Sequence, residues 1–282
     1  MLKNTLILYG TGWLAVALAI VFPALAWLSP LAFMVILPAG AVWVWKSHAG
    51  SLKDLGLRFS AGWMRRLGLG LLVGLAIPLL FQGLELWGGW IRLGPRQVSI
   101  QFLLLSLPLV LLRMLLVVGI EEFVFRGFFL QALGGGTPAL PGGGIGAGGW
   151  AVIILSSLLW GAGHLVSMAG NGLAPGSIML GMTSFLLWGV TQSLCFLKTE
   201  KSLWLPYGMH LGINLSFGFS LLGWFFSIQP AGPQWWIGHP TWIPESGLLG
   251  VVVWLVFALA AYLVKRKTLP AAETAGQPET RP

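Results

Sequence analysis

Long apolar runs separated by short polar segments make up most of the chain. Because a helix needs roughly 20 apolar residues to cross a bilayer, each run is a candidate transmembrane helix, although the second is short. The runs lie at about residues 5–28, 31–45, 67–90, 102–132, 150–169, 177–197, 203–226 and 247–264. The pattern predicts an all-α polytopic membrane protein, a bundle of about eight transmembrane helices.

The composition excludes an ordinary soluble domain. Of the 282 residues, 56% are hydrophobic and only 9% are charged, which is far from the balance of a globular protein. The polar segments are too short for a separate soluble domain, so we predict a single transmembrane helical domain over residues 1–267. Residues 268–282 are polar and rich in Pro, Ala and Glu, a composition typical of a disordered tail.

The net charge of +8 indicates membrane topology and no nucleic-acid partner, because the basic residues collect at the ends of apolar runs. Eight helices with the amino terminus inside put both termini in the cytoplasm. They also put most cations there: Lys3, Lys46, Lys53, Arg58, Arg65, Arg66, Lys198, Lys201, Lys265, Arg266, Lys267 and Arg281. Arg92 and Arg96 fall outside. A secretory signal is the alternative for residues 1–26, where Ala24-Leu25-Ala26 resembles a cleavage site, and the charge pattern fits either case.

Three ionisable residues interrupt the fourth apolar run at Glu121, Glu122 and Arg126. A charge at the bilayer centre costs at least about 2.5–3.5 kcal/mol, so such residues normally face the bundle interior and have a function. Glu122 and Arg126 are four residues apart and can pair on one helix face. Glu121 is turned about 100° away, which leaves it available for chemistry. Arg113, in the same run, has no acid close in sequence and stays unexplained.

Further polar residues occur on two later runs: His164, four residues after Trp160, and His210, four residues before Asn214. A lone histidine on an apolar helix is more often a packing residue than a catalyst, but two histidines together with a glutamate pair favour chemistry. Other hydrolytic sites have no candidates. The chain has one cysteine, one aspartate, no HExxH and no GxSxG, which argues against thiolate zinc sites, an aspartyl dyad, a thermolysin-like helix and a serine nucleophile elbow.

Gly70 and Gly74 form a small-xxx-small pair in the third run. Such pairs let two membrane helices approach closely. We therefore predict that another helix packs against this face.

Together the three motifs resemble the CPBP family, which comprises the CAAX prenyl endoproteases and their bacterial relatives. The motifs are Glu-Glu-xxx-Arg at Glu121, Glu122 and Arg126, aromatic-xxx-His at Trp160 and His164, and His-xxx-Asn at His210 and Asn214. The resemblance covers about residues 50–225. Trp160 stands where phenylalanine is usual.

The resemblance implies an intramembrane endopeptidase of eight helices with a conical cavity open to the cytoplasm and the membrane. Glu121 and His164 would hold and activate the attacking water, and His210 and Asn214 would stabilise the oxyanion. Glu122, Arg126 and Trp160 would support them. Glu121, His164 and His210 would be the ligands if a zinc ion were needed, but we favour a glutamate-dependent enzyme with no cofactor.

The expected substrate is a membrane-embedded or lipid-anchored protein, and prenylated CAAX proteins are among the candidates. The short loops and the lack of an appended domain favour the inner or plasma membrane of a prokaryotic cell. Two alternatives stay open. Buried Glu and His residues also occur in proton-coupled transporters, and a noncatalytic scaffold could bind partner helices. The sequence does not indicate the physiological substrate or the oligomeric state.

Overall fold

The structure, a computed structural model, describes residues 1–21, 32–48, 50–95, 98–134, 145–170, 172–217, 226–239 and 246–264. The predicted polar tail at 268–282 lies outside the described residues. So do the possible cleavage motif Ala24-Leu25-Ala26, Arg96, and the four cations predicted at the carboxyl terminus, Lys265, Arg266, Lys267 and Arg281.

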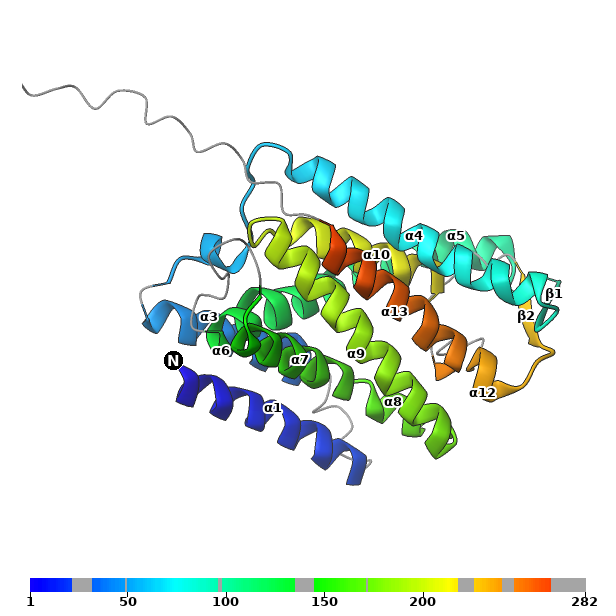
Figure 1. The fold of residues 1–282 in the computed structure, drawn as a ribbon, viewed down its shortest axis with the longest axis horizontal. Helices are drawn as coiled ribbons and strands as arrows, with labels where there is room; N and C mark the ends of the chain where they lie inside the picture. The colour runs from blue at the N-terminus through cyan, green and yellow to red at the C-terminus, as the bar shows by residue number, and fades with distance from the viewer. Residues whose placement is uncertain are drawn as a thin grey trace, which may run out of the picture.

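Helices occupy the described part of every predicted apolar run (Figure 1). The first two runs form α1 (Leu2–Val21) and the π-helix η2 (Ala32–Ile36), which continues into α3 (Leu37–Ser47). The longer helices that follow are α4 (Trp63–Trp87), α5 (Ile100–Glu122), α7 (Ala147–Ala162), α9 (Pro175–Lys198), α10 (Trp204–Phe217) and α13 (Leu248–Leu263). The shorter ones are η3 (Leu52–Leu55), α8 (Leu165–Gly170) and α12 (Gln234–Ile237).

Among the described residues, three helices are long and apolar enough to cross a membrane: Trp63–Trp87, Ile100–Leu133 and Pro175–Lys198. The second is composite, since α5 continues through the π-helix η4 (Phe123–Phe129) into α6 (Leu130–Leu133). Met34–Ser47, Ala147–Ala162 and Leu248–Leu263 are apolar but shorter. These lengths support an integral membrane protein, whereas the number of eight crossings stays a prediction.

A small two-stranded sheet departs from the all-α prediction. Strand β1 (Ile91–Gly94) pairs antiparallel with β2 (Ser227–Pro230), with Ile91 opposite Pro230. Each strand has four residues, the lower limit of the alternation that predicts a strand. The pairing joins segments more than 130 residues apart and ties the region after α4 to the region before α12.

Helix α4 packs tightly against α10 along its glycine face (Figure 1). A Cβ atom on Gly70 would lie 2.2 Å from the carbonyl oxygen of Leu205, and one on Gly74 would lie 2.1 Å from that of Met209. Both distances are far below van der Waals contact. The close approach predicted from the small-xxx-small pair is thereby confirmed.

Helix α10 contributes its own glycines to this contact. A Cβ atom on Gly208 would meet the carbonyl oxygen of Leu67 at 2.3 Å, and one on Gly212 would meet that of Leu71 at 2.6 Å. His210 lies between these two glycines. The α4–α10 contact therefore sets the depth and rotation of the histidine that enters the candidate site.

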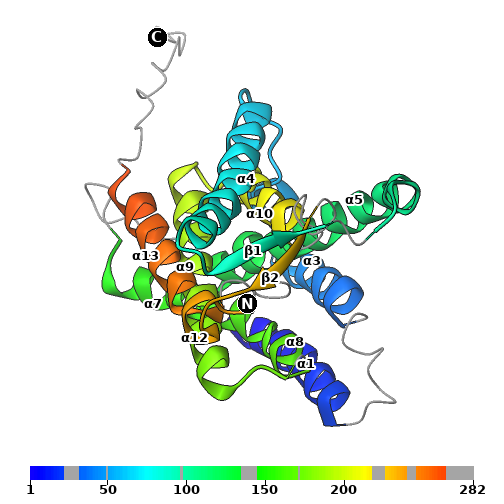
Figure 2. The ribbon, with the colours of Figure 1, turned by 90° about the vertical axis from the view of Figure 1, so that its right-hand side faces the viewer.

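Aromatic side chains fill the core between α7, α9, α10 and α13. Trp188 of α9 stacks on Trp254 of α13, with ring centroids 5.0 Å apart and an angle of 3° between the planes. Trp160 of α7 meets Trp188 edge-on at 4.9 Å. Helix α5 extends away from this group of helices (Figure 2), and many of its leucines are exposed. Its carboxyl-terminal end, with η4, enters the core.

Candidate functional site

The two neighbouring carboxylates lie where α5 passes into the π-helix η4. The Glu121 side chain is 23% exposed, whereas that of Glu122 is only 1% exposed. This difference follows the rotation of about 100° between successive helical residues. π-Helical turns inside longer helices are frequent at functional sites.

Glu122 is held in a buried ion pair. Nη1 of Arg126 donates a hydrogen bond of 3.2 Å to Oε1 of Glu122, and both side chains are 1% exposed. The pair is the one that the spacing of four residues predicts. Nη2 of Arg126 and Oε2 of Glu122 have no hydrogen-bond partner among the described residues. The pair is therefore joined by one hydrogen bond.

His210 of α10 lies between the two carboxylates. Its Nδ1 is 2.7 Å from Oε1 of Glu122, and its Nε2 is 3.8 Å from Oε2 of Glu121. The histidine and Glu122 are 88 residues apart in the chain. The imidazole therefore links the paired glutamate to the more exposed one.

Trp160, near the end of α7, contacts most of the candidate site residues. Its indole N–H donates a hydrogen bond of 2.8 Å to Oε2 of Glu121. The guanidinium carbon of Arg126 lies 4.6 Å from the centre of its ring. The ring centroids of His164 and His210 are 4.9 and 5.7 Å away. The indole nitrogen is a donor that phenylalanine at this position would lack.

His164 lies just beyond the end of α7. Its ring stacks on Phe185 with centroids 4.2 Å apart, and its Nδ1 is 3.3 Å from the carbonyl oxygen of Trp160. No hydrogen bond joins His164 to Glu121 in the described part of the chain. Both residues instead contact Trp160, Glu121 through the indole N–H and His164 through its ring.

Asn214 and Arg113 do not take part in the hydrogen bonds and ion pairs of the candidate site among the described residues. Asn214 is half-buried on α10, one turn after His210, and Arg113 is exposed on α5. Neither makes a hydrogen bond or an ion pair with a described residue. A spacing of four residues places Asn214 on the same face of α10 as His210.

Trp188 belongs to the site although the sequence analysis did not single it out. Its ring packs edge-on against His210 at 5.0 Å and is itself backed by Trp254. No pattern in the sequence marks it, because a tryptophan inside an apolar run is as readily a packing residue. Only the arrangement of α9, α10 and α13 brings it to the histidine.

Among the described residues, no group of three or more His, Cys, Asp or Glu side chains is placed to hold a metal ion. Nδ1 of His210 is engaged with Glu122, and Nδ1 of His164 faces a backbone carbonyl. The three residues expected as zinc ligands, Glu121, His164 and His210, form no such group in the described structure, and independence from a metal stays a prediction.

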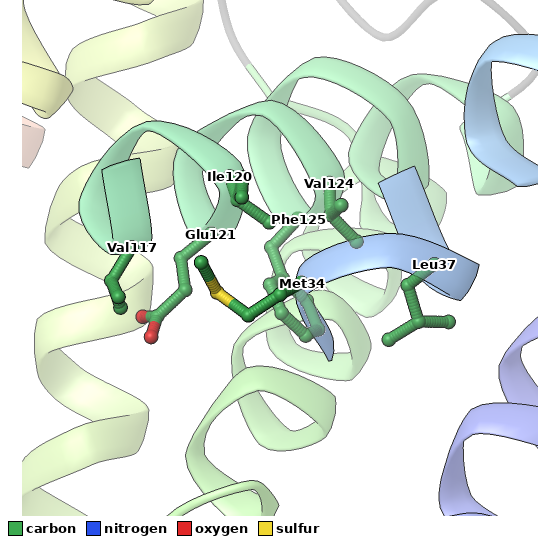
Figure 3. Close-up of a pocket in the computed structure, with 7 residues that line it drawn as sticks. All are labelled: Met34, Leu37, Val117, Ile120, Glu121, Val124 and Phe125. Atoms are coloured by element: carbon green, nitrogen blue, oxygen red, sulfur yellow. The ribbon is translucent and has the colours of Figure 1, made fainter. Parts of the chain in front are cut away.

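An apolar pocket opens beside Glu121 (Figure 3). It encloses about 290 Å³, including the space at its open mouth. In Figure 3, Glu121 and Met34 point into the same space from facing elements, α5 and η2. Six of the seven side chains that line it are apolar; the full set is Met34, Leu37, Val117, Ile120, Glu121, Val124 and Phe125.

Comparison with known families bears on this geometry. Residues 103–216 match the model of a family described as type II CAAX prenyl endopeptidase, Rce1-like. This part of the chain is similar to that family, and we call it the Rce1-like segment. The match confirms the resemblance to the CPBP family that the three motifs indicate. A search of curated proteins found no match to the chain.

The Rce1-like segment contains all seven candidate residues, from Glu121 to Asn214. It does not contain Met34 and Leu37 of the pocket, or Trp254 behind Trp188. The apolar helices support a protein integral to the membrane, and the matched segment is similar to a family of CAAX prenyl endopeptidases. Elements outside the matched segment complete the surroundings of Glu121.

Proposed function

We propose that the chain is an intramembrane endopeptidase that hydrolyses peptide bonds of membrane-embedded or lipid-anchored proteins. The observation that carries the proposal is the contrast between the two neighbouring glutamates. Glu122 is buried and engaged with Arg126 and His210, whereas Glu121 is partly exposed and lines a pocket. One carboxylate is used to build the site and the other is left to react.

The two oxygens of Glu121 have different surroundings. Oε2 accepts the Trp160 hydrogen bond and faces His210, whereas Oε1 has no hydrogen-bond partner among the described residues. In the proposed reaction the oxygen of a water molecule attacks the carbonyl carbon while Oε1 of Glu121 accepts a proton from that water. Oε1 later gives the proton to the leaving amine. His164 has an Nε2 without a described partner and would help to orient the water.

His210 would stabilise the oxyanion through Nε2. A carboxylate can only accept a hydrogen bond, so Nδ1 carries a hydrogen toward Glu122. Donation from Nε2 then requires a doubly protonated ring. The positive charges of the His210 ring and Arg126 balance the negative charges of the Glu121 and Glu122 carboxylates, so the net charge of the four groups is zero. Asn214 would supply a second donor, and one such donor typically contributes roughly 3–4 kcal/mol.

The substrates follow from the family and from the membrane setting. The matched family is named for endopeptidases of prenylated CAAX proteins, so a lipid-anchored substrate is the first to test. We further propose eight membrane crossings with both termini in the cytoplasm, on the distribution of Lys and Arg, and a prokaryotic membrane, on the short loops. Catalysis depends on Glu121 and requires no metal.

The test compares peptide termini in membranes of cells that make the native protein or Glu121→Gln at equal abundance. The amide has nearly the shape of the carboxylate but cannot accept the proton, so termini that appear only with the native protein are expected. Their sequences would identify the substrates. Equal termini, with both proteins folded, would refute the proposal, and proton-flux and helix-binding assays would then test the transporter and scaffold alternatives.

A further inference from the structure

Three aromatic side chains form a cluster at one end of the bundle, away from the candidate site. The ring of Phe59 lies 5.2 Å from that of Trp63 and 4.9 Å from that of Trp204. Trp63 is the first residue of α4 and Trp204 is the first of α10, so the cluster joins the starts of two helices (Figure 1). Phe59 is 70% exposed. Because tryptophans gather where membrane helices leave the bilayer, this aromatic cluster marks a membrane–water interface.

The segment that carries Phe59 and Trp63, residues 51–66, is basic. It holds four cations, and acids pair with only two of them. Arg58 lies 3.0 Å from Asp54, and Arg66 lies 3.5 Å from Glu200. The surface beside the aromatic cluster therefore keeps a positive charge.

The other two cations, Lys53 and Arg65, are exposed and form no ion pair with a residue that the structure describes. Arg65 lies in the first turn of α4, where the helix dipole repels a positive charge, so it does not stabilise its own helix. Two free cations beside exposed aromatic rings suit the headgroup region of an anionic membrane, where phosphates attract the cations and the acyl boundary takes up the rings.

The same segment is fastened to the π-helix that follows the two glutamates. Nε2 of Gln131 donates hydrogen bonds to the carbonyl oxygens of Asp54, at 2.8 Å, and Gly127, at 2.7 Å. A Cβ atom on Gly127 would lie 2.7 Å from the carbonyl oxygen of Leu55. The helix η3 therefore packs directly on η4.

The segment is also fastened to the start of α10, the helix that carries His210. The N–H of Leu203 donates to the carbonyl oxygen of Gly56 at 3.1 Å. The indole N–H of Trp204 donates to the carbonyl oxygen of Arg58 at 2.7 Å. A ligand that holds this segment at the membrane surface would thus steady both elements that bring the carboxylates and His210 together.

We propose that this surface binds the headgroup of an anionic phospholipid of the cytoplasmic leaflet, through Lys53 and Arg65, and that the bound lipid supports cleavage. Positive charge is complementary to the anionic lipids of that leaflet. The choice of leaflet rests on the proposed topology, and the effect on cleavage rests on the proposed endopeptidase function. The binding itself rests on neither.

The binding experiment is native mass spectrometry of the full-length protein in detergent, with phosphatidylglycerol and phosphatidylcholine competing for it. The native protein should retain phosphatidylglycerol in preference. One cation near an anionic surface changes the affinity about fivefold, so Lys53→Gln with Arg65→Gln should lower this preference about 25-fold. Lys53→Arg with Arg65→Lys keeps both charges and should keep the preference.

Lys3→Gln with Arg92→Gln is the matched control, because it removes the same charge from exposed positions on α1 and β1. It should retain the native preference. An equal preference in the native protein and in the Lys53→Gln, Arg65→Gln variant would overturn the lipid site, and so would an equal loss in the control.

The cleavage experiment uses nanodiscs of phosphatidylcholine alone or mixed with phosphatidylglycerol. Cleavage that depends on Glu121 should be faster with phosphatidylglycerol. Gln131→Leu should bind this lipid as the native protein does but lose the acceleration, because the bridge from η3 to η4 is broken. An acceleration that survives in Gln131→Leu would overturn the link to η4. If no cleavage depends on Glu121, the endopeptidase function fails, while the lipid preference still decides the binding site.

Discussion

Replacing Glu122 by Gln should destabilise the protein far more than the same change at Glu121. The carboxylate of Glu122 accepts hydrogen bonds from Nη1 of Arg126 at 3.2 Å and from Nδ1 of His210 at 2.7 Å. Glutamine keeps an oxygen at this position but removes the charge. Arg126, which is 1% exposed, then loses the carboxylate that forms its ion pair and is left as a buried cation.

Breaking a buried ion pair on one side typically costs about 3–5 kcal/mol. Separated helices of a membrane protein stay in the bilayer and find other partners there, so we expect the lower end for Glu122→Gln, about 3 kcal/mol. Arg126→Met should cost less, because His210 remains as a donor to Glu122. The Arg126→Met variant should lose roughly the free energy of one hydrogen bond to a charged group, about 1.5–3 kcal/mol of stability.

The double variant separates a structural role of the pair from a catalytic one. Replacing both charges removes the uncompensated cation, so Glu122→Gln with Arg126→Met should be more stable than Glu122→Gln alone. Cleavage should nevertheless stay low in the double variant. Nδ1 of His210 then faces a neutral amide in place of the carboxylate that accepts its hydrogen bond, so the imidazole is held less firmly beside Glu121.

The assay is equilibrium unfolding in mixed micelles with increasing dodecyl sulfate, followed by tryptophan fluorescence, with peptide cleavage measured on the same preparations. Glu121→Gln is the control. It should change the stability by about 1 kcal/mol or less, because Glu121 is partly exposed and has no Arg partner. The reasoning would be refuted if Glu122→Gln were as stable as the native protein, or if the losses of the two single variants simply added in the double variant.

Three further outcomes are expected. Gly74→Ala should prevent stable folding because its Cβ would lie 2.1 Å from the Met209 carbonyl oxygen, whereas Gly83→Ala, on the same helix with open space around it, should be neutral or stabilising by about 0.5–1 kcal/mol; equal unfolding midpoints would contradict the packing. Trp160→Phe should keep the fold and lower kcat about tenfold with little change in KM, since removing a hydrogen bond to a charged group costs about 1.5 kcal/mol or more; an unchanged kcat would show that the indole N–H does not help Glu121. A chelator should leave cleavage intact, and a loss that zinc restores would establish a metalloenzyme.

The sequence alone determined the features that depend on local spacing. The apolar runs predicted helices because helix length and bilayer thickness are linked, and the spacing of four residues predicted the Glu122–Arg126 pair because such residues share a helix face. The same geometry separated Glu121 from Glu122. The glycine pair at Gly70 and Gly74 predicted a close helix contact. The three motifs indicated the family that the comparison also found.

Only the tertiary structure decided how these local features meet. His210 and Glu122 are 88 residues apart in the chain. The packing of α10 on α4 therefore decides that His210 contacts both carboxylates, and with which nitrogen it contacts each. The bond from Trp160 to Glu121, the Trp188 contact and the pocket wall at Met34 likewise arise between helices. Helix periodicity states which residues share a face. It does not state which faces meet, because that choice is made by side-chain packing across the whole bundle.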